Sequence, residues 1–255
     1  MTFINNVNLS NKYHVSSLPH IGFRGSSQGL YPNLNIGVQD SFSTNPLYEN
    51  LGTKAQIEAA ARSNPRIVEI LKENNIPLKI NIEEFENLKN GHLKHSRITA
   101  AKLYSSLPPD LKKEVNLSDL QEAAMFHDYG KVLIPKEILN KKGTLTPDEK
   151  KIMELHSELG YELLKNQKLK ESVLNLIKYH HQNPHGTGYP SAANDFKFDT
   201  SAQILSAADK YSALTEKRSY KDAMSKEQAL SILQEDVNNG QISQEVFDAL
   251  KKSLS

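Results

Sequence analysis

The chain has 255 residues, a formal net charge of +1 and no cysteine. The near-neutral charge predicts no surface for a nucleic-acid polymer or a membrane, and the missing cysteines exclude disulfides and thiolate metal sites. No stretch approaches the about 18 apolar residues of a membrane span, and the first residues lack the basic and apolar regions of a Sec signal, so we expect a cytoplasmic protein.

Residues 1–53 differ in character from the rest of the chain. They are rich in Asn, Ser and Gly, carry almost no charge and show no helical period, so we expect a disordered or loosely packed leader. Residues 54–90 predict a short helical lead-in, with two helices broken near Asn64-Pro65. Leu78 to Ile82 is the best candidate for a strand.

The remaining chain, residues 91–255, predicts a succession of helices. Three helix starts carry a capping-box sequence, in which Ser or Thr is followed three residues later by Glu or Gln. They begin at Ser118, Thr146 and Ser225. Two further helices are expected at 169–181 and 201–214, and a last one begins at Ser243. The fold class is therefore all-α.

Histidines are concentrated in one part of the chain, because seven of the nine lie between positions 92 and 185. In the helix after Thr146, His156 shares an i, i+4, i+7 stripe with apolar residues, so its side chain points inward. In the next helix His180 shares a stripe with Val173 and Ile177, and His181 lies about 100° round the helix. A single inward histidine is more often a core residue with a hydrogen-bond partner than a metal ligand.

An inward carboxylate is harder to explain as part of a core. Asp209 lies on a helix face that is otherwise made of Ala, Leu and Ser. A buried carboxylate must be paired, bind a metal or be neutralised, since burial of the free charge is costly. Because three successive helices each contribute an inward metal-ligand type, the sequence favours a metal site over three separate core residues.

The stretch FHDYGKVLIP, residues 126–135, places His127 and Asp128 at the end of a helix. A neutral imidazole beside a hard carboxylate suits a divalent first-row metal. Gly130 permits the turn that follows, and Lys131 offers a compact charge for a phosphate near the metals. The alternative for Lys131 is a solvated surface lysine.

Two histidines in GHLKHSRITAAKL, residues 91–103, compete for a place in the same site. His95 can face a core together with Ile98 and Leu103, whereas His92 lies on a neighbouring track of the helix. We therefore favour His95 as the ligand and keep His92 as the alternative.

Taken in order, H…HD…H…HH…D, these residues resemble the HD superfamily of metal-dependent phosphohydrolases, and specifically its HD-GYP branch. The motifs are HDYGKVLIP, HSELG, YHHQNPHGTGYP and DKYSALTEKR, within residues 91–254. The resemblance implies an HD-domain helical bundle with a metal centre of two or three ions, often iron or manganese. It also implies a phosphodiesterase acting on a cyclic dinucleotide, most often cyclic di-GMP.

The resemblance assigns roles to named residues of this chain. The family's metal ligands fall on His95, His127, Asp128, His156, His180, His181 and Asp209. Substrate contacts fall on Lys131, Gly188, Tyr189, Pro190 and Arg218. Asp128 would bridge the metals and, with Lys131, carry the catalytic role.

Three departures from the family pattern limit what the resemblance implies. Gln182 and His185 stand where the family commonly has acidic residues, and Ser219 replaces the proline of its RPY motif. Members with a third metal carry Glu four residues before the first histidine, where this chain has Gly91. We therefore expect two divalent ions and leave substrate preference open.

Two other functions stay open from the sequence. One is an HD-type phosphohydrolase that acts on another nucleotide or phosphate ester. The other is a metal-binding sensor or scaffold module that turns over slowly. The expected partner is a cyclic dinucleotide substrate, and protein signalling partners cannot be read from the sequence.

Overall fold

The computed structural model describes residues 51–191, 196–217 and 222–255. Within these ranges the chain is helical and contains no β-strand, which confirms the all-α class. The strand expected at Leu78 to Ile82 is therefore wrong. Residues 78–81 belong to no regular element, and Ile82 already begins a helix. The amide of Asn81 donates to the carbonyl of Val132 at 2.8 Å, and a single such hydrogen bond does not make a ladder.

The lead-in consists of α2 (Lys54–Ser63), α3 (Pro65–Glu73) and α4 (Ile82–Asn90). The break at Asn64-Pro65 is confirmed, because the Asn64 side chain caps α3 by accepting from two backbone amides. The expected leader boundary at residue 53 lies inside the fold. Leu51 is fully buried, and the Tyr129 hydroxyl donates to its carbonyl. Residues 1–50 of the expected leader lie outside the described residues.

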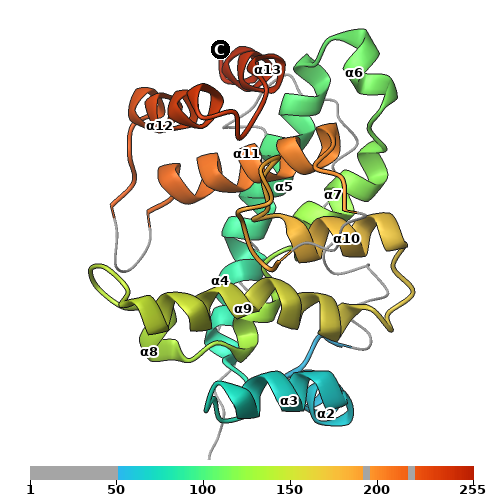
Figure 1. The fold of residues 1–255 in the computed structure, drawn as a ribbon, viewed down its shortest axis with the longest axis vertical. Coiled ribbons are helices and arrows are strands. Elements are labelled where there is room, and N and C mark those ends of the chain that lie inside the picture. The colour runs from blue at the N-terminus through green and yellow to red at the C-terminus, as the bar shows by residue number, and fades with distance from the viewer. Residues whose placement is uncertain (1–50, 192–195, 218–221) are drawn as a thin grey trace, which may run out of the picture. The chain divides into compact units, whose positions relative to one another are not determined.

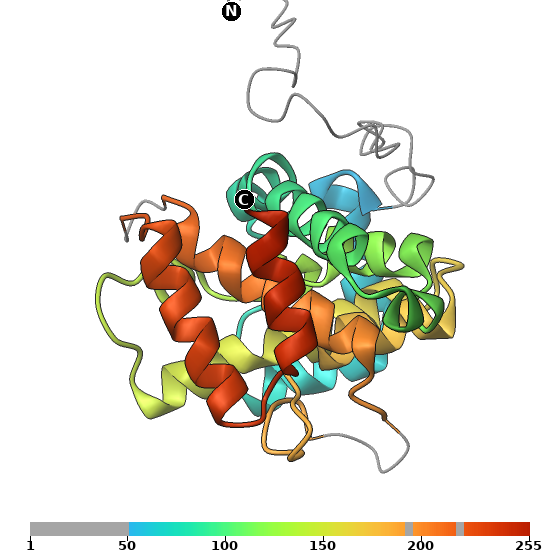
Figure 2. The same ribbon diagram turned by 90° about the horizontal axis from the view of Figure 1, so that it is seen from above.

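Helix α5 (His92–Ser106) runs through the middle of the bundle (Figure 1). It packs against α7 (Leu117–Phe126), α11 (Thr200–Thr215) and α13 (Gln244–Ser253). Small buried residues, including Ala100 and Ala208, line these helices and allow close approach. Figure 2 shows α12 (Lys226–Asn238) beside α13, with both covering α11.

A second layer of helices carries the histidine-rich motifs. It contains the 3-10 helix η2 (Tyr129–Leu133), α9 (Pro147–Leu164) and α10 (Glu171–Tyr179), and α9 packs against both of the others. The short helices α6 (Pro109–Lys113) and α8 (Lys136–Leu139) complete the described elements. Because α10 also packs on α7, this layer is tied to the middle of the bundle.

Helix starts follow the capping expectations in all but one case. Thr146 and Ser225 form the expected capping boxes, and Ser243 caps α13. Ser118 does not cap a helix, because Asn116 accepts from the amide of Asp119 and α7 begins at Leu117. The helix therefore starts two residues earlier than the capping-box sequence predicts.

Among the described residues, no helix has the length and apolar character needed to cross a membrane.

Candidate metal centre

Two groups of potential metal ligands meet in the core of the bundle. The first contains Asp128, His156, His180 and His181, and the second contains His92, His127, Asp128 and Asp209. Within each group, the ligand atoms all lie within 4.8 Å of one another. The side chains come from α5, the α7–η2 junction, α9, the end of α10 and α11, so five separate segments converge on one place.

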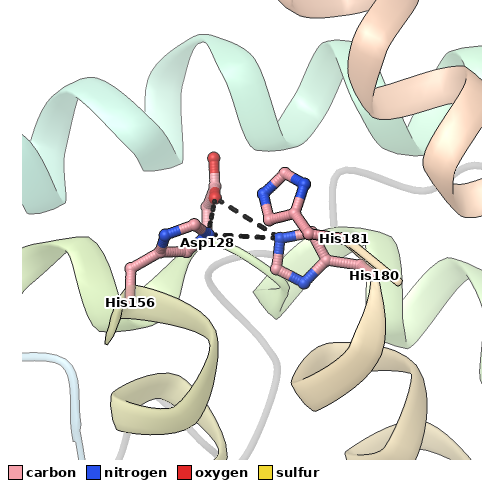
Figure 3. A group of neighbouring side chains, drawn as sticks. All are labelled: Asp128, His156, His180 and His181. Carbon is pink, nitrogen blue, oxygen red and sulfur yellow. Dashed lines mark hydrogen bonds and ion pairs between the residues drawn. The ribbon is translucent and has the colours of Figure 1, made fainter. Parts of the chain in front are cut away.

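Asp128 belongs to both groups and offers a different oxygen to each. Its Oδ1 lies 3.3 Å from Nε2 of His156 and 3.9 Å from Nε2 of His180. Dashed lines in Figure 3 mark these contacts. Its Oδ2 lies 3.4 Å from Nε2 of His92 and 3.6 Å from Nε2 of His127. This is the arrangement of a carboxylate that bridges two neighbouring sites.

Three of the histidines are oriented by their own helices. The Nδ1 atoms of His127, His156 and His180 lie 3.0, 2.7 and 2.7 Å from the carbonyl oxygen three residues earlier in the chain. Each Nδ1–H therefore donates to the backbone, which leaves the lone pair of Nε2 directed into the cluster. Such fixing of the tautomer is typical of metal-binding histidines.

The protonation states of most of the ligands suit metal binding. His92 differs, because its contacts with Asp209 and Glu216 outweigh burial and raise its pKa to about 9, so a metal at its Nε2 would displace a proton. Burial lowers the pKa of His156 to about 3 and that of His181 to about 4, so both rings are neutral near pH 7. Burial would raise the pKa of Asp128, but the nearby Lys131 and the histidines hold it well below its usual range. The nearby imidazoles of His127 and His92 likewise outweigh burial at Asp209 and hold its pKa well below its usual range. Ionised carboxylates and neutral imidazoles are the forms that bind a metal.

The composition of the cluster fits a divalent metal. The Nε2 atom of His127 and the Oδ1 atom of Asp128 are buried and have no hydrogen-bond partner among the described residues. Such atoms are costly to bury unless something else satisfies them. Imidazole and carboxylate together suit first-row divalent ions, so a metal at these positions would satisfy both atoms.

The structure reverses the order of preference between His92 and His95. His92 is buried, and its Nε2 lies 2.8 Å from Oδ1 of Asp209, whereas His95 belongs to neither ligand group. The side chain of His95 is 29% exposed, and its Nδ1 lies 3.1 Å from Oε1 of Glu216. His92 is the first residue of α5, and His95 follows three residues later on the same helix.

Lys131 lies beside the cluster rather than in solvent. Its ammonium lies 2.6 Å from Oδ2 of Asp128, and its side chain is 15% exposed. The contact compensates the charge of a fully buried carboxylate. A free surface lysine, which was the alternative from sequence, is therefore excluded.

The glycine-rich turn closes over one side of the cluster. A β-carbon on Gly188 would stand 2.1 Å from the carbonyl oxygen of His181, so only glycine fits there. The ring of Tyr189 packs against that of His181, with centroids 4.6 Å apart and an angle of 32° between the ring planes. The Gln182 side chain fixes this turn with two hydrogen bonds. It donates to the carbonyl of Pro190 at 2.5 Å and accepts from the amide of Gly188 at 3.2 Å.

The remaining residues singled out from the sequence lie elsewhere. His185 is exposed, and its ring Nε2 contacts the carbonyl of Asn239 at 3.0 Å, so it joins the turn to the α12–α13 connection. Arg218 and Ser219 lie outside the described residues. Glu216, which the sequence did not point to, contacts both His92 and His95.

Comparisons with known proteins agree with this architecture. The family model described as "HD domain" matches residues 81–246. The cyclic di-GMP phosphodiesterase of Thermotoga maritima is 33% identical over 141 residues, which are 54% of this chain and 38% of that protein. The 3'3'-cGAMP-specific phosphodiesterase 3 of Vibrio cholerae is 32% identical over 136 residues, which are 53% of this chain and 29% of that protein. This chain thus covers less than two-fifths of the length of either relative.

Solved structures show the same fold. Bd1817, an HDG"Y"P protein from Bdellovibrio bacteriovorus, is similar with a TM-score of 0.54 at 19% identity, over 84% of this chain and 69% of that chain. The HD domain of the L. monocytogenes phosphodiesterase PgpH gives a TM-score of 0.50 at 16% identity, over 66% of this chain and 90% of that chain. With the family model spanning most of the described residues, the chain belongs to the HD domain family.

Proposed function

We propose that the chain is an HD-GYP-type phosphodiesterase that hydrolyses a cyclic dinucleotide, most readily cyclic di-GMP, to a linear dinucleotide or further to mononucleotide. The observation that carries this proposal is the position of Asp128, whose two oxygens face two separate groups of histidines. A carboxylate placed in this way can hold two ions a few ångströms apart, the arrangement used for in-line displacement at phosphorus.

Seven side chains would hold the metals. Asp128 would be shared, with His92, His127 and Asp209 on one side and His156, His180 and His181 on the other. Bound divalent ions would supply a hydroxide nucleophile at neutral pH and a positive clamp for the phosphoryl oxygens. We propose iron or manganese, since imidazole and carboxylate ligands without thiolates suit both.

The number of ions in this proposal is two. The third-metal pattern needs a glutamate four residues before the first histidine. With His92 as that histidine the position is Leu88, and with His95 it is Gly91, so neither choice supplies a carboxylate.

Lys131 and the glycine-rich turn are proposed to meet the substrate. Lys131 can exchange part of its contact with Asp128 for a non-bridging phosphate oxygen, because its ammonium already lies at the edge of the cluster. Gly188, Tyr189 and Pro190 would form one wall of the cleft, with the Tyr189 ring available for contact with a base. The role of Arg218 rests on the family resemblance alone.

The named activities of the relatives support a cyclic dinucleotide and divide between two of them, cyclic di-GMP and 3'3'-cGAMP. The test is therefore hydrolysis of both compounds by protein loaded with Fe²⁺ or Mn²⁺, with products separated by chromatography. We expect a linear dinucleotide from at least one of them. Turnover of a different phosphate ester with neither cyclic dinucleotide cleaved would favour the broader phosphohydrolase class, and metal binding without turnover would favour a sensor module.

A further inference from the structure

His92 is the one histidine of its ligand group that cannot be oriented by its own helix. The other histidine of the group, His127, donates Nδ1–H to the backbone carbonyl three residues earlier in the chain. His156 and His180 do the same in the neighbouring group. His92 is the first residue of α5, with Gly91 as the N-cap, so no turn of α5 precedes it. Its orientation has to come from another part of the chain.

Glu216 occupies the position that the missing carbonyl would take. Its Oε2 lies 2.9 Å from Nδ1 of His92, and its side chain is 18% exposed. Glu216 caps the C-terminal end of α11, seven residues after Asp209, which is about two turns later on the same helix face. His92 is therefore held between two carboxylates of one helix, Asp209 at Nε2 and Glu216 at Nδ1.

We propose that Glu216 is the positioning carboxylate of His92: it accepts Nδ1–H, fixes the tautomer and directs Nε2 at the proposed metal site shared with Asp209. The inference rests on the proposed metal centre and adds a residue to it that touches neither ion nor substrate. Carboxylate–histidine–metal arrangements of this kind raise the basicity of the ligand, and their loss costs roughly 10- to 100-fold in metal affinity.

His95 takes a part in the same arrangement. Its Nδ1 lies 3.1 Å from Oε1 of Glu216, the oxygen that His92 does not use. One carboxylate is thus held by two histidines one helical turn apart on α5. Hydrogen bonds to both outweigh its partial burial and lower the pKa of Glu216 to about 2. The carboxylate is ionised at neutral pH and accepts from both rings.

The experiment measures Mn²⁺ binding to purified variants of the 255-residue chain by equilibrium dialysis with elemental analysis. Glu216→Ala should weaken the more affected ion by roughly 10- to 100-fold. Glu216→Gln should retain most of the affinity, because its amide oxygen can still accept Nδ1–H. Circular dichroism of the metal-free proteins shows whether the alanine variant is folded, and the glutamine variant, which is nearly isosteric, keeps the test valid if it is not.

Two controls separate positioning from other effects. Glu154→Gln removes one charge from a partly exposed residue of α9 that belongs to neither ligand group, so its Mn²⁺ affinity should match wild type. His95→Ala removes the contact of Glu216 with His95 but keeps its contact with His92, so it should cost much less than Glu216→Ala.

Several results would overturn the inference while the proposed function stands. They are wild-type affinity in Glu216→Ala, equal losses in the alanine and glutamine variants, or a loss in His95→Ala as large as that in Glu216→Ala, which would make His95 a ligand. Absence of metal from the wild-type protein would instead remove the proposed function itself. The two failures are therefore distinguishable in the same measurements.

Discussion

The backbone of Gly130 lies directly against the carbonyl of His156: a β-carbon on Gly130 would stand 2.0 Å from that oxygen and 2.5 Å from the amide nitrogen of Gly160. Because Gly130 follows Asp128 by two residues, this contact sets the position of the shared carboxylate relative to α9. The 3.3 Å separation between Asp128 and His156 depends on it.

Gly130→Ala should therefore disrupt the packing of η2 on α9. The clashing atoms belong to the backbone and cannot rotate away, so we expect destabilisation at or above the roughly 1–3 kcal/mol typical of overpacking, together with loss of bound metal. Gly143→Ala is the control, because nothing lies within 4 Å of its added β-carbon and only its φ of +95° is unfavourable. The melting temperature and metal content of both variants are measured and compared with wild type. Full metal occupancy in Gly130→Ala would contradict the role of this contact.

Asp128→Ala should abolish turnover and empty both sites. Losing the shared carboxylate removes a ligand from each group at once, while the helices keep their apolar contacts. Elemental analysis and circular dichroism should show a folded protein with little metal. His127→Ala removes a ligand from one group only, so this variant should lose activity but keep more metal than Asp128→Ala. Substantial turnover by metal-supplied Asp128→Ala would show that this carboxylate has been assigned wrongly.

Lys131→Ala should leave metal binding nearly intact and lower kcat/KM by roughly 10²–10³-fold, the scale of one lost electrostatic contact in a transition state. Lys131→Arg should recover only part of this, since a planar guanidinium does not occupy the place of a compact ammonium. Steady-state kinetics at full metal occupancy provide the measurement. Wild-type kcat/KM in the alanine variant would remove Lys131 from the site.

Gln182→Ala should loosen the glycine-rich turn without touching the metals. The side chain joins the carbonyl of Pro190 to the amide of Gly188 and is almost fully buried, so its loss frees the segment that carries Tyr189. We expect a raised KM for the cyclic dinucleotide with metal content unchanged. Asn183→Ala, which alters hydrogen bonds at the exposed tip of the turn, serves as the comparison. Equal KM values for both variants and wild type would show that the turn does not bind substrate.

Asp119 gives the fold a pH dependence away from the metal ligands. Burial raises its pKa, but hydrogen bonds from Lys170 and Ser172 outweigh this and lower it. A lowered pKa in the folded state adds stability above the unfolded value of about 3.9, and this stability is lost as pH falls through the folded value. Asp119→Asn should therefore be less stable at pH 7, by about 1 kcal/mol or less because Lys170 is mostly exposed. Urea unfolding at pH 7 and near pH 3 should show that the difference in unfolding free energy between wild type and Asp119→Asn becomes smaller at the lower pH.

Most of the helices, and six of the seven side chains that meet in the cluster, could be predicted from the sequence, because caps, breaks and apolar stripes are local signals. His92 was ranked below His95 for an identifiable reason. His92, Ser96, Thr99 and Leu103 recur at i, i+4, i+7 and i+11 and are all buried, the same pattern that placed His156. Ser96 and Thr99 are small and polar, so this stripe is not recognised as an apolar helix face from the sequence. Small residues are nevertheless what the close packing of α5 against its neighbours requires.

Glu216 could not be found in this way. Its position follows from the end of α11 meeting the start of α5, and those segments are 124 residues apart in the chain. A glutamate after the last turn of a helix is usually a solvated residue, and no spacing rule connects it with a histidine so distant. The expected strand failed for a related reason, since only the three-dimensional partner decides whether an extended segment becomes part of a sheet.

The convergence of five segments on one cluster has a consequence for the stability of the whole molecule. A bound ion would cross-link His92 to Asp209, which are 117 residues apart, and the shared Asp128 would tie that link to α9 and α10. Free metal at about 1,000 times its dissociation constant adds about 4 kcal/mol to folding, a large fraction of a typical domain's total. Metal supply would thus regulate the lifetime of the protein as well as its turnover, since a metal-starved chain unfolds more often and is exposed to proteases each time.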